Sequence, residues 1–378
     1  MYAGRLSRKT RHPCSGFTWV ELVVSLAIIG LLAALLLPAV RQTRPTARRA
    51  QCQNNLRNVS TAMQAYATTR QGELPPLTGG FQIADPSDQV KGGGNRDAPW
   101  SVVILPYVEQ STLQDRLRMS PGWDRPSDVD LQRLAQTSIE CYICPDTLNP
   151  VSGGLSYVAN AGIIAEDSWW SDSAESFDFG FNGYGAENRN DDDAELAYAT
   201  GVFWRVPVGT KTETGTPAPL NLDQISARDG TSQTILLSEN LNTRSYDSVS
   251  GSGGWISDDT GDIAFGIAVP GTREGTAFRV ALSDTAGGLG VAGGAQEAAL
   301  ALSEKPVPLH CRINANLKNA VNGRSPRPSS NHDGAVNMVF ADGSCRVISE
   351  KIDLSVYARL LSPMGGRYGQ SAVSFSDF

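Results

Sequence analysis

Histidine is scarce in this sequence, and its scarcity limits the chemistry that the chain can support. The 378 residues include only three histidines, His12, His310 and His332. Histidine is the commonest metal ligand and a frequent acid–base group, so a catalytic metal centre would have few ligands available. The chain also lacks a Gly-x-Ser-x-Gly nucleophile motif and a second Cys-x-x-Cys pair. We therefore expect no enzyme activity, no catalytic residue and no resident metal.

Basic surfaces are lacking outside the N-terminal region. The chain has 32 basic and 39 acidic residues, which gives a formal net charge of −7. Residues 1–49 contain eight basic residues and one acidic residue, net +7, so the remainder has a net charge of −14. An acidic body rich in glycine and proline argues against nucleic-acid binding. A basic N-terminal segment favours retention of that end in the cytoplasm.

One long apolar run follows this basic segment. Residues 17–40 contain a single charged side chain, Glu21. A helix rises about 1.5 Å per residue, so a run of this length is sufficient to cross a bilayer. A secretory signal peptide would have a shorter apolar core with its small cleavage residue afterwards, whereas Gly16 comes before the run. A plain membrane anchor fits the length but leaves the carboxylate of Glu21 unexplained.

The residues Gly16-Phe17-Thr18-Trp19-Val20-Glu21 resemble the type IV prepilin signal of pilins and pseudopilins. That signal is a short basic leader ending in Gly, followed by Phe and by a Glu at the fifth position of the mature chain. Trp19 departs from the leucine that is usual in these families. The resemblance implies cleavage between Gly16 and Phe17 by a prepilin peptidase and methylation of the new amino group. It also implies that Glu21 pairs with the N-terminus of a neighbouring subunit in a filament.

The helix is expected to continue beyond the apolar run. Cys52, Leu56, Val59, Met63 and Tyr66 recur at steps of four, three, four and three residues, which places them on one helix face. The predicted organisation is a leader over 1–16, a transmembrane assembly helix over 17–40, an amphipathic continuation over 41–72 and a β-rich exported domain over 73–378. Within that domain, we expect a loop over 78–99, a helix interrupted near Pro106 and a short helix over 131–139.

The chain has six cysteines, Cys14, Cys52, Cys141, Cys144, Cys311 and Cys345. Removal of the leader would leave five in a compartment where disulfides persist. The Cys141-x-x-Cys144 pair could serve a disulfide, a zinc site or redox chemistry, and a disulfide is favoured because structural zinc needs four ligands. Our predicted bridges are Cys52–Cys144, with Cys141 as the alternative partner, and Cys311–Cys345.

Residues 155–300 show short apolar runs separated by Gly, Asp, Ser and Pro, which favours an antiparallel sheet. The runs are Leu155–Ile164, Gly201–Val208, Thr234–Ser238, Ile263–Val269 and Phe278–Leu282. The acidic stretch Glu166–Asp193 is expected to be a solvated loop, with calcium binding as a less favoured alternative. The glycines at 288–293 match a dinucleotide fingerprint by letter but lack its βαβ setting, so we interpret them as a loop.

The C-terminal region contains a hairpin signal. Residues 335–340 alternate as in a strand, and Asp342-Gly343 is a strong turn before the return strand. His332 lies nine residues before Asp342, and Asp353 can cap a closing helix over 351–364. We expect the His332 ring to hydrogen-bond a turn and fix this hairpin. Partner binding, or catalysis or metal binding by His332, Asp342 and Glu239, are the alternatives.

This spacing resembles the H-x9-DG element of a bacterial family of pseudopilin-like proteins whose body domain is otherwise uncharacterised. Short segments in matching order extend the resemblance over most of the chain: Leu74-Pro75-Pro76, Leu105-Pro106-Tyr107, Cys144-Pro145-Asp146, Tyr157-Val158-Ala159-Asn160 and Asp229-Gly230-Thr231-Ser232.

We therefore expect an α+β fold in which a long N-terminal helix packs on an antiparallel β-rich domain. The predicted function is a structural and assembly protein of a type II secretion or type IV pilus-like system. Its partners would be the membrane, the prepilin peptidase and methylase, and other pseudopilins. It would cross the bacterial inner membrane once, with its body periplasmic or extracellular. The alternatives are a membrane-anchored binding protein, with Trp169-Trp170 against a ligand such as carbohydrate, and an anchored hydrolase.

Overall fold

The structure is a computed structural model of the chain. The described residues are 17–82, 95–119, 129–147, 153–165, 200–206, 219–244, 254–257, 260–269, 271–274, 277–280, 312–315, 317–319, 322–323, 325, 327–368, 370 and 373. The predicted leader, the acidic stretch with its calcium alternative, the Trp169-Trp170 pair and the glycines at 288–293 lie outside these residues.

The first element is the helix α1 (Trp19–Thr69), which is 51 residues long. The chain divides into two compact units, residues 1–47 and residues 48–378, so α1 contributes to both. Within the described residues, no helix combines the length and the hydropathy that a membrane span requires. The predicted span 17–40 includes residues 36–40, whose side chains lie outside the description.

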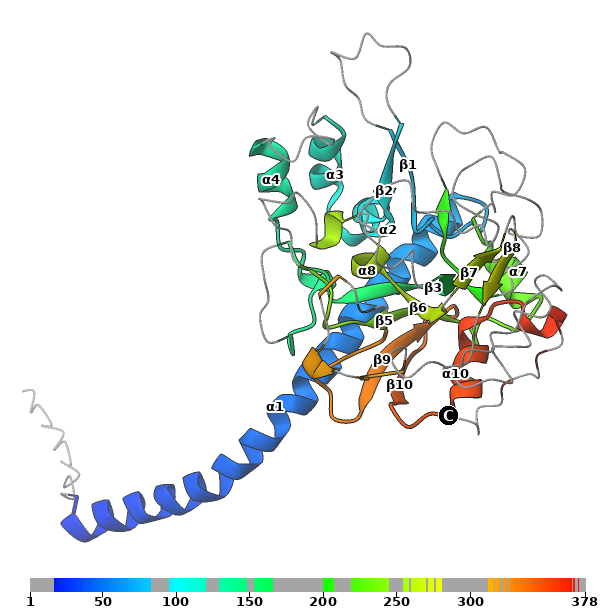
Figure 1. Cartoon of the computed structure of the whole chain (residues 1–378). Helices are drawn as coiled ribbons and strands as arrows, with labels where there is room; N and C mark the ends of the chain where they lie inside the picture. The colour runs from blue at the N-terminus through cyan, green and yellow to red at the C-terminus, as the bar shows by residue number, and fades with distance from the viewer. Residues whose placement is uncertain are drawn as a thin grey trace, which may run out of the picture. The chain divides into compact units, whose positions relative to one another are not determined.

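The second unit is built on a five-stranded sheet with the order β10-β9-β5-β3-β6 (Figure 1). Its strands are β3 (Tyr157–Ala165), β5 (Ile235–Glu239), β6 (Ala264–Val269), β9 (Ala335–Phe340) and β10 (Cys345–Ser349). β3 and β6 are parallel, while the other three pairings are antiparallel. The expected α+β fold is thus confirmed, and the expected antiparallel pairing holds for three of these four pairings, while the parallel β3–β6 pair departs from it. A parallel pair needs a long connection, and nearly a hundred residues separate β3 from β6 in the sequence.

A second sheet has the strand order β2-β1-β4, with β1 (Thr78–Gln82), β2 (Asn95–Pro99) and β4 (Arg205–Val206). The first two strands occupy the ends of the stretch that we predicted as a loop. Glycine is normally depleted in strands, yet here it permits a close approach, because a Cβ at Gly79 would lie 2.6 Å from Cγ of Pro76. A separate two-stranded sheet pairs β7 (Gly271–Glu274) with β8 (Ala277–Val280).

Short helices connect the strands. They are α2 (Trp100–Val103), η1 (Leu105–Val108), α3 (Ser111–Arg118), α4 (Val129–Ala135), η2 (Glu140–Tyr142), α7 (Leu222–Ser226), η5 (Gly254–Ile256), α8 (Thr260–Ile263), η7 (Leu317–Asn319), α10 (Leu354–Leu361) and η8 (Gly365–Tyr368). The interruption predicted near Pro106 is confirmed. The predicted cap of the closing helix is also confirmed, because Oδ1 of Asp353 accepts from the backbone N–H groups of Ser355 and Val356 at 2.8 and 3.3 Å.

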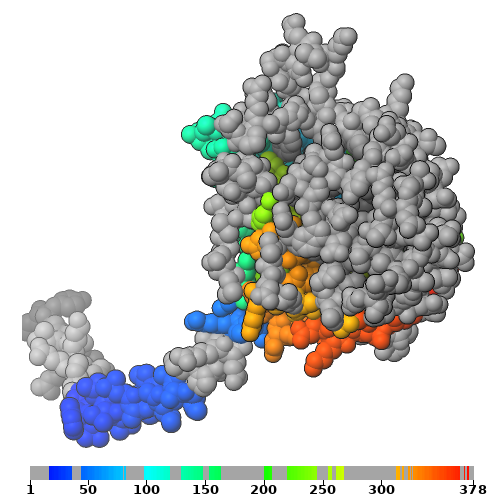
Figure 2. Space-filling model, viewed as in Figure 1, coloured from blue at the N-terminus to red at the C-terminus, as the bar shows by residue number. Residues whose placement is uncertain are grey.

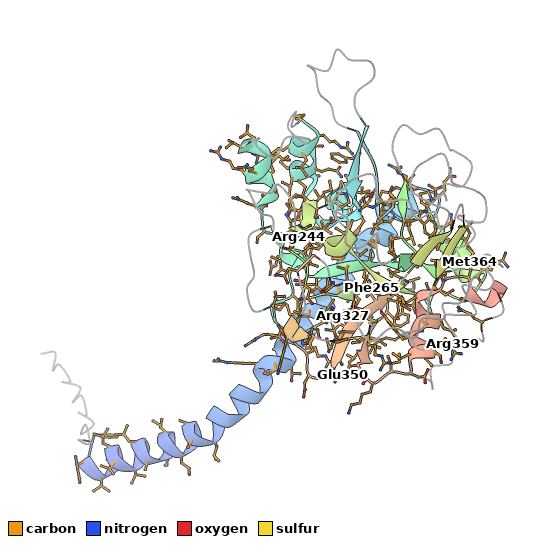
Figure 3. All side chains as sticks on the ribbon, viewed as in Figure 1. Arg244, Phe265, Arg327, Glu350, Arg359 and Met364 are labelled. Carbon is orange, nitrogen blue, oxygen red and sulfur yellow. A yellow bond between two sulfur atoms is a disulfide. The ribbon has the colours of Figure 1, made fainter. Side chains whose placement is uncertain are left out.

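Residues 48–69 of α1 and the five-stranded sheet both contribute to the core of the second unit. Leu56, Val59 and Met63 have no exposed surface, as the helical spacing predicts. The hydroxyl of the buried Tyr157 side chain donates to the carbonyl of Cys52 at 3.2 Å. Phe265 of β6 is also fully buried, and Figure 3 labels it within this body. The helix and the sheet are therefore joined by apolar packing and by hydrogen bonds that involve side chains.

The C-terminal hairpin forms as predicted. β9 and β10 are antiparallel with Val339 opposite Cys345, and the chain reverses through Asp342 and Gly343. Gly343 has φ of 80°, the left-handed region that glycine adopts without strain. Oδ1 of Asp342 accepts from the Ser344 N–H at 2.8 Å and thereby stabilises the turn.

Candidate functional site at the Cys52–Cys144 bridge

One disulfide joins α1 to the body. Cys52 lies on the buried face of α1, and Cys144 lies just after η2. Their sulfur atoms are bonded and their Cα atoms are 4.9 Å apart, which is usual for a disulfide. The predicted Cys52–Cys144 bridge is thus present. Cys141 and Cys345 are free thiols, so the alternative partner and the predicted Cys311–Cys345 bridge are both wrong. Cys311 itself lies outside the described residues.

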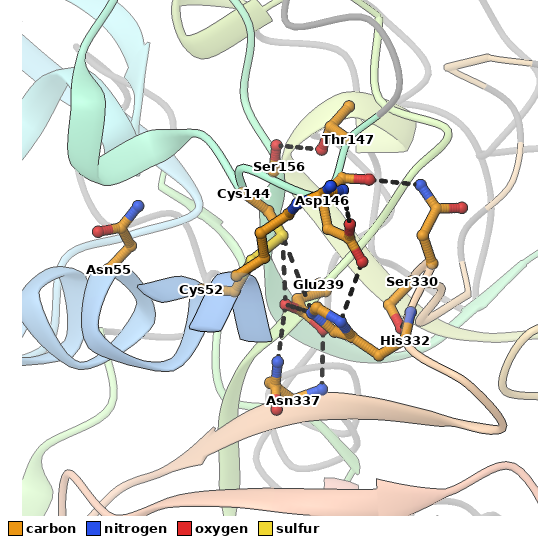
Figure 4. The surroundings of a disulfide bond; sticks show 12 residues. Cys52, Asn55, Cys144, Asp146, Thr147, Ser156, Glu239, Ser330, His332 and Asn337 are labelled. Carbon is orange, nitrogen blue, oxygen red and sulfur yellow. Dashed lines mark hydrogen bonds and ion pairs between the residues drawn. A yellow bond between two sulfur atoms is a disulfide. The ribbon is translucent and has the colours of Figure 1, made fainter. Parts of the chain in front are cut away.

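A buried histidine and a buried glutamate lie against this bridge (Figure 4). Nε2 of His332 is 3.2 Å from Oε1 of Glu239. The Sγ atom of Cys144 is 3.7 Å from that same carboxylate oxygen and 3.9 Å from Nε2. His332 and Glu239 are 93 residues apart in the sequence and are brought together by the pairing of β5 with β9.

The other nitrogen of the His332 ring faces a second carboxylate. Nδ1 lies 3.3 Å from Oδ2 of Asp146, two residues after Cys144. Nη1 of Arg48 in turn contacts Oδ1 of Asp146 at 2.9 Å. The ring therefore has a carboxylate partner at each of its two nitrogens. Arg48, Asp146, His332 and Glu239 form a chain of alternating basic and acidic groups from the surface into the core.

Glu239 is oriented by Asn337 of β9. The backbone N–H of Asn337 donates to Oε2 at 2.9 Å, and its side-chain Nδ2 donates to Oε1 at 2.9 Å. Gln53 of α1 donates from Nε2 to the Asn337 side-chain oxygen at 3.1 Å, which fixes the orientation of that amide. Both carboxylate oxygens of Glu239 are thus positioned before any ligand binds.

The loop that presents His332 is fixed locally. The His332 backbone N–H donates to Oγ of Ser330 at 3.1 Å, and that hydroxyl donates to the Ala335 carbonyl at 2.6 Å. The hydroxyl of Ser330 is therefore engaged in the loop and is not presented as a nucleophile to His332. Within the part of the chain that the structure describes, this arrangement supplies acid–base groups and a disulfide.

The family comparison adds to this geometry. A family model described as "Protein of unknown function (DUF1559)" matches residues 41–355. The chain belongs to this family. The match includes every residue of the site from Arg48 to Asn337, while residues 1–40 precede it. No curated protein and no solved structure matches the chain.

In this DUF1559 chain, His332 and the Asp342-Gly343 pair of the H-x9-DG spacing lie at different places and do not form one site. His332 precedes β9 and Asp342-Gly343 follows it, and a six-residue strand extends over roughly 20 Å. The Asp342 N–H instead donates to the Thr231 carbonyl at 3.0 Å. Our expectation that the His332 ring fixes a turn of the hairpin was wrong, because its partners are Glu239 and Asp146. The sequence suggested Glu239 beside His332, but it did not predict Asp146 or Asn337 as site residues. Asp146 was noted only as part of the Cys144-Pro145-Asp146 segment.

The surroundings of the free thiols of Cys141 and Cys345 favour their neutral form. Burial raises the pKa of Cys141 to about 11 and that of Cys345 to about 12. Thiol–disulfide exchange proceeds through the thiolate, so these two cysteines are poor attacking groups at neutral pH. Burial, followed by the nearby Glu239 carboxylate, raises the pKa of Tyr157 well above its usual value. The Tyr157 hydroxyl on β3 is thus a neutral donor to the Cys52 carbonyl beside the bridge.

Proposed function

We propose that this chain is a pseudopilin-like structural and assembly protein of a type II secretion or type IV pilus-like system. It would be cleaved between Gly16 and Phe17, methylated on Phe17, and anchored in the bacterial inner membrane by residues 17–40. The body would lie in the periplasm or outside the cell. The family is associated with pilin-like proteins that have prepilin signals, which is in agreement with this proposal.

The observation that carries the proposal is the exposed apolar surface at the start of α1. Between residues 17 and 35, large apolar side chains are 45–79% exposed on all sides of the helix, and they form the dark blue surface in Figure 2. They are Phe17, Trp19, Val20, Leu22, Val23, Val24, Leu26, Ile28, Ile29, Leu31, Leu32 and Leu35. A helix that is apolar all round needs an apolar environment, which lipid or neighbouring helices of a filament would supply.

Glu21 is exposed within this surface and has a local partner. Its carboxylate accepts from the Thr18 backbone N–H at 2.9 Å and from the Thr18 hydroxyl at 2.8 Å. The Glu21 N–H donates back to Oγ1 of Thr18 at 3.3 Å, so the two residues form a reciprocal capping box at the start of α1. Glu21 would therefore both begin the helix and, in a filament, offer its charge to the N-terminus of a neighbour.

The first test is the N-terminal sequence and intact mass of the chain extracted from bacterial membranes. A mature chain that begins with N-methyl-Phe17 is expected. Gly16→Ala should block processing while leaving the body unchanged, and Gly30→Ala, where a Cβ meets nothing within 4 Å, is the matched control. Retention of residues 1–16 in the membrane-extracted chain would contradict the processing step.

The two roles of Glu21 can be separated by paired substitutions. Glu21→Gln removes the charge but keeps a side chain that can complete a capping box. Thr18→Val removes the capping hydroxyl and keeps the charge. If the charge drives assembly, cross-linking between chains in the membrane should be lost in Glu21→Gln and retained in Thr18→Val. The reverse result would assign Glu21 to helix capping alone and would count against the assembly role.

A further inference from the structure

The disulfide site contains the ligand set of a metal centre. Cys52, Cys144, Glu239 and His332 are all buried, and one ligand atom from each lies within 4.8 Å of the other three. A disulfide sulfur is a poor metal ligand, because metals bind the thiolate. The set therefore becomes complete only after the bridge is reduced. We propose that reduction of Cys52–Cys144 creates a four-ligand Zn²⁺ site from the two thiolates, Nε2 of His332 and a carboxylate oxygen of Glu239.

The distances agree with a tetrahedral site. Zinc–ligand bonds of about 2.0–2.3 Å place the ligand atoms of a tetrahedron ~3.3–3.8 Å apart. Three of the six edges are already close to these values, at 3.2 Å for His332 to Glu239, 3.7 Å for Cys144 to Glu239 and 3.9 Å for Cys144 to His332. The edge that must lengthen is the bonded sulfur pair, now at 2.07 Å.

The surrounding residues match the outer shell of a zinc centre. A zinc-binding histidine usually donates its second ring N–H to a carboxylate, and Asp146 stands in that position on Nδ1. A zinc-binding carboxylate is usually held by hydrogen bonds, and Asn337 supplies two to Glu239. Arg48 beside Asp146 adds a positive charge near a centre that would contain three anionic ligands and one dication.

The chemistry balances with a dithiol as the reductant. The dithiol gives two electrons and two protons to the bridge, so that Cys52 and Cys144 become thiols and the dithiol becomes a disulfide. Zn²⁺ then displaces the two thiol protons, and His332 binds through an unprotonated Nε2. Both states join α1 to the body at the same residues, by a covalent bond when oxidised and through the metal when reduced. The site would thus keep this connection in either redox environment.

The test uses the full chain in detergent, oxidised or reduced with a small dithiol that is then removed without oxygen. Each form is titrated with Co²⁺, and Zn²⁺ is used to displace it. The reduced chain should bind one Co²⁺ with thiolate-to-cobalt charge-transfer bands and the visible bands of tetrahedral cobalt, whereas the oxidised chain should show neither. Equal binding by the two forms, or cobalt bound without thiolate bands, would overturn the proposal.

Variants assign the ligands. A chain with Cys14, Cys141, Cys311 and Cys345 all changed to Ser should keep the cobalt signal, because it retains Cys52 and Cys144, the two proposed thiolate ligands. Asp146→Asn should weaken Zn²⁺ binding about 10–100-fold, the usual effect of losing an outer-shell partner. Glu239→Gln should alter the spectrum and weaken binding further. A signal that is lost with the four outlying cysteines, or that is unchanged in Glu239→Gln, would count against this ligand set. The oxidised–reduced comparison of the unaltered chain decides the matter even where a variant does not fold.

Discussion

The two halves of α1 differ in how their apolar residues are arranged. Over residues 17–35 apolar side chains cover the whole circumference of the helix and are exposed. Over residues 48–69 the apolar residues recur at helical spacing on one face, and that face is buried, with Cys52, Leu56 and Val59 fully covered. A helix that packs on its own chain buries one apolar face and keeps the opposite face polar. A helix that is apolar on all sides is suited to an apolar environment outside its own chain. The two parts of α1 therefore have patterns that suit different surroundings, the body of the chain for residues 48–69 and an external apolar environment for residues 17–35.

The largest expected effect on stability comes from removing the Cys52–Cys144 disulfide, which joins the buried half of α1 to the body. Cys52→Ala with Cys144→Ala opens a closed loop of 92 residues, which should reduce the free energy of unfolding by about 4–5 kcal/mol. The measurement is urea unfolding in the presence of a chelator, so that bound metal cannot compensate. Cys141→Ala with Cys345→Ala, which removes two free thiols, is the control. A comparable loss of unfolding free energy in both double variants would mean that the disulfide itself does not stabilise the fold.

One leucine from each half of α1 tests whether the difference in burial is matched by a difference in stability. Leu56→Ala should cost about 2–5 kcal/mol of unfolding free energy, because it leaves a cavity at a fully buried position. Leu26, which is 59% exposed, should tolerate the same change within about 0.5 kcal/mol in the same urea experiment. A similar cost at both positions would show that the exposed half is covered by the chain itself.

Two adjacent asparagines test the polar contacts of the buried half. Nδ2 of Asn55 donates to the carbonyls of Glu140 and Ile143 at 3.2 and 2.9 Å, next to the bridge. Asn55→Ala should cost about 1–3 kcal/mol, because two carbonyl oxygens lose their donor. Asn54 is exposed, so Asn54→Ala is the matched control and should be nearly neutral. Thermal unfolding of the two variants side by side provides the measurement, and equal midpoints would contradict the role of Asn55.

The smallest expected effect on stability is at the start of α10, which depends on a local capping residue as the start of α1 does. Asp353 caps α10, and hydrogen bonds from the Ser355 side chain and backbone and from the Val356 N–H hold the pKa of its carboxyl below the ordinary value. A carboxyl with a lowered folded-state pKa stabilises the fold fully above its unfolded pKa of about 3.9 and loses that contribution as the pH falls through the folded value. Asp353→Ala should cost about 1 kcal/mol at neutral pH.

The pH dependence distinguishes the charge of this cap from its hydrogen bonds. Asp353→Asn keeps a good capping side chain, so its stability at neutral pH should stay close to that of the native chain. Below about pH 4 the native chain should lose the contribution of the ionised carboxyl while the Asn variant does not. Urea unfolding between neutral and acidic pH measures this divergence of the two chains at low pH. Parallel curves over the whole range would show that the carboxyl makes no ionised contribution.

Local patterns were sufficient for the elements whose signals lie within one segment. The helical spacing from Cys52 to Tyr66, the Asp342-Gly343 turn and the Asp353 cap each depend on residues that are close in sequence. The Cys52–Cys144 bridge was predictable because one cysteine lies on a buried helix face and the other begins a motif. The Cys345 thiol was misassigned because cysteine counting does not specify geometry.

Long-range pairings were not predictable in the same way. The parallel alignment of β3 with β6 depends on how a long connection crosses the sheet, which no short motif encodes. β1 was missed because Gly79 and Gly80 are poor strand formers, and there the close approach to Pro76 outweighs propensity. The meeting of Asp146, Glu239 and His332 depends on three separate segments, so the spacing of His332 to Asp342 gave the wrong partners.

The position of the bridge along α1 has a mechanical consequence. Among the cysteines and large apolar residues of residues 48–69, Cys52 is the first fully buried one. Tension applied from the N-terminal end of the helix would therefore enter the body through a covalent bond before it reaches the packed face beyond. The sulfur pair would bear this load first, and the contacts of Leu56, Val59 and Met63 would be protected from it.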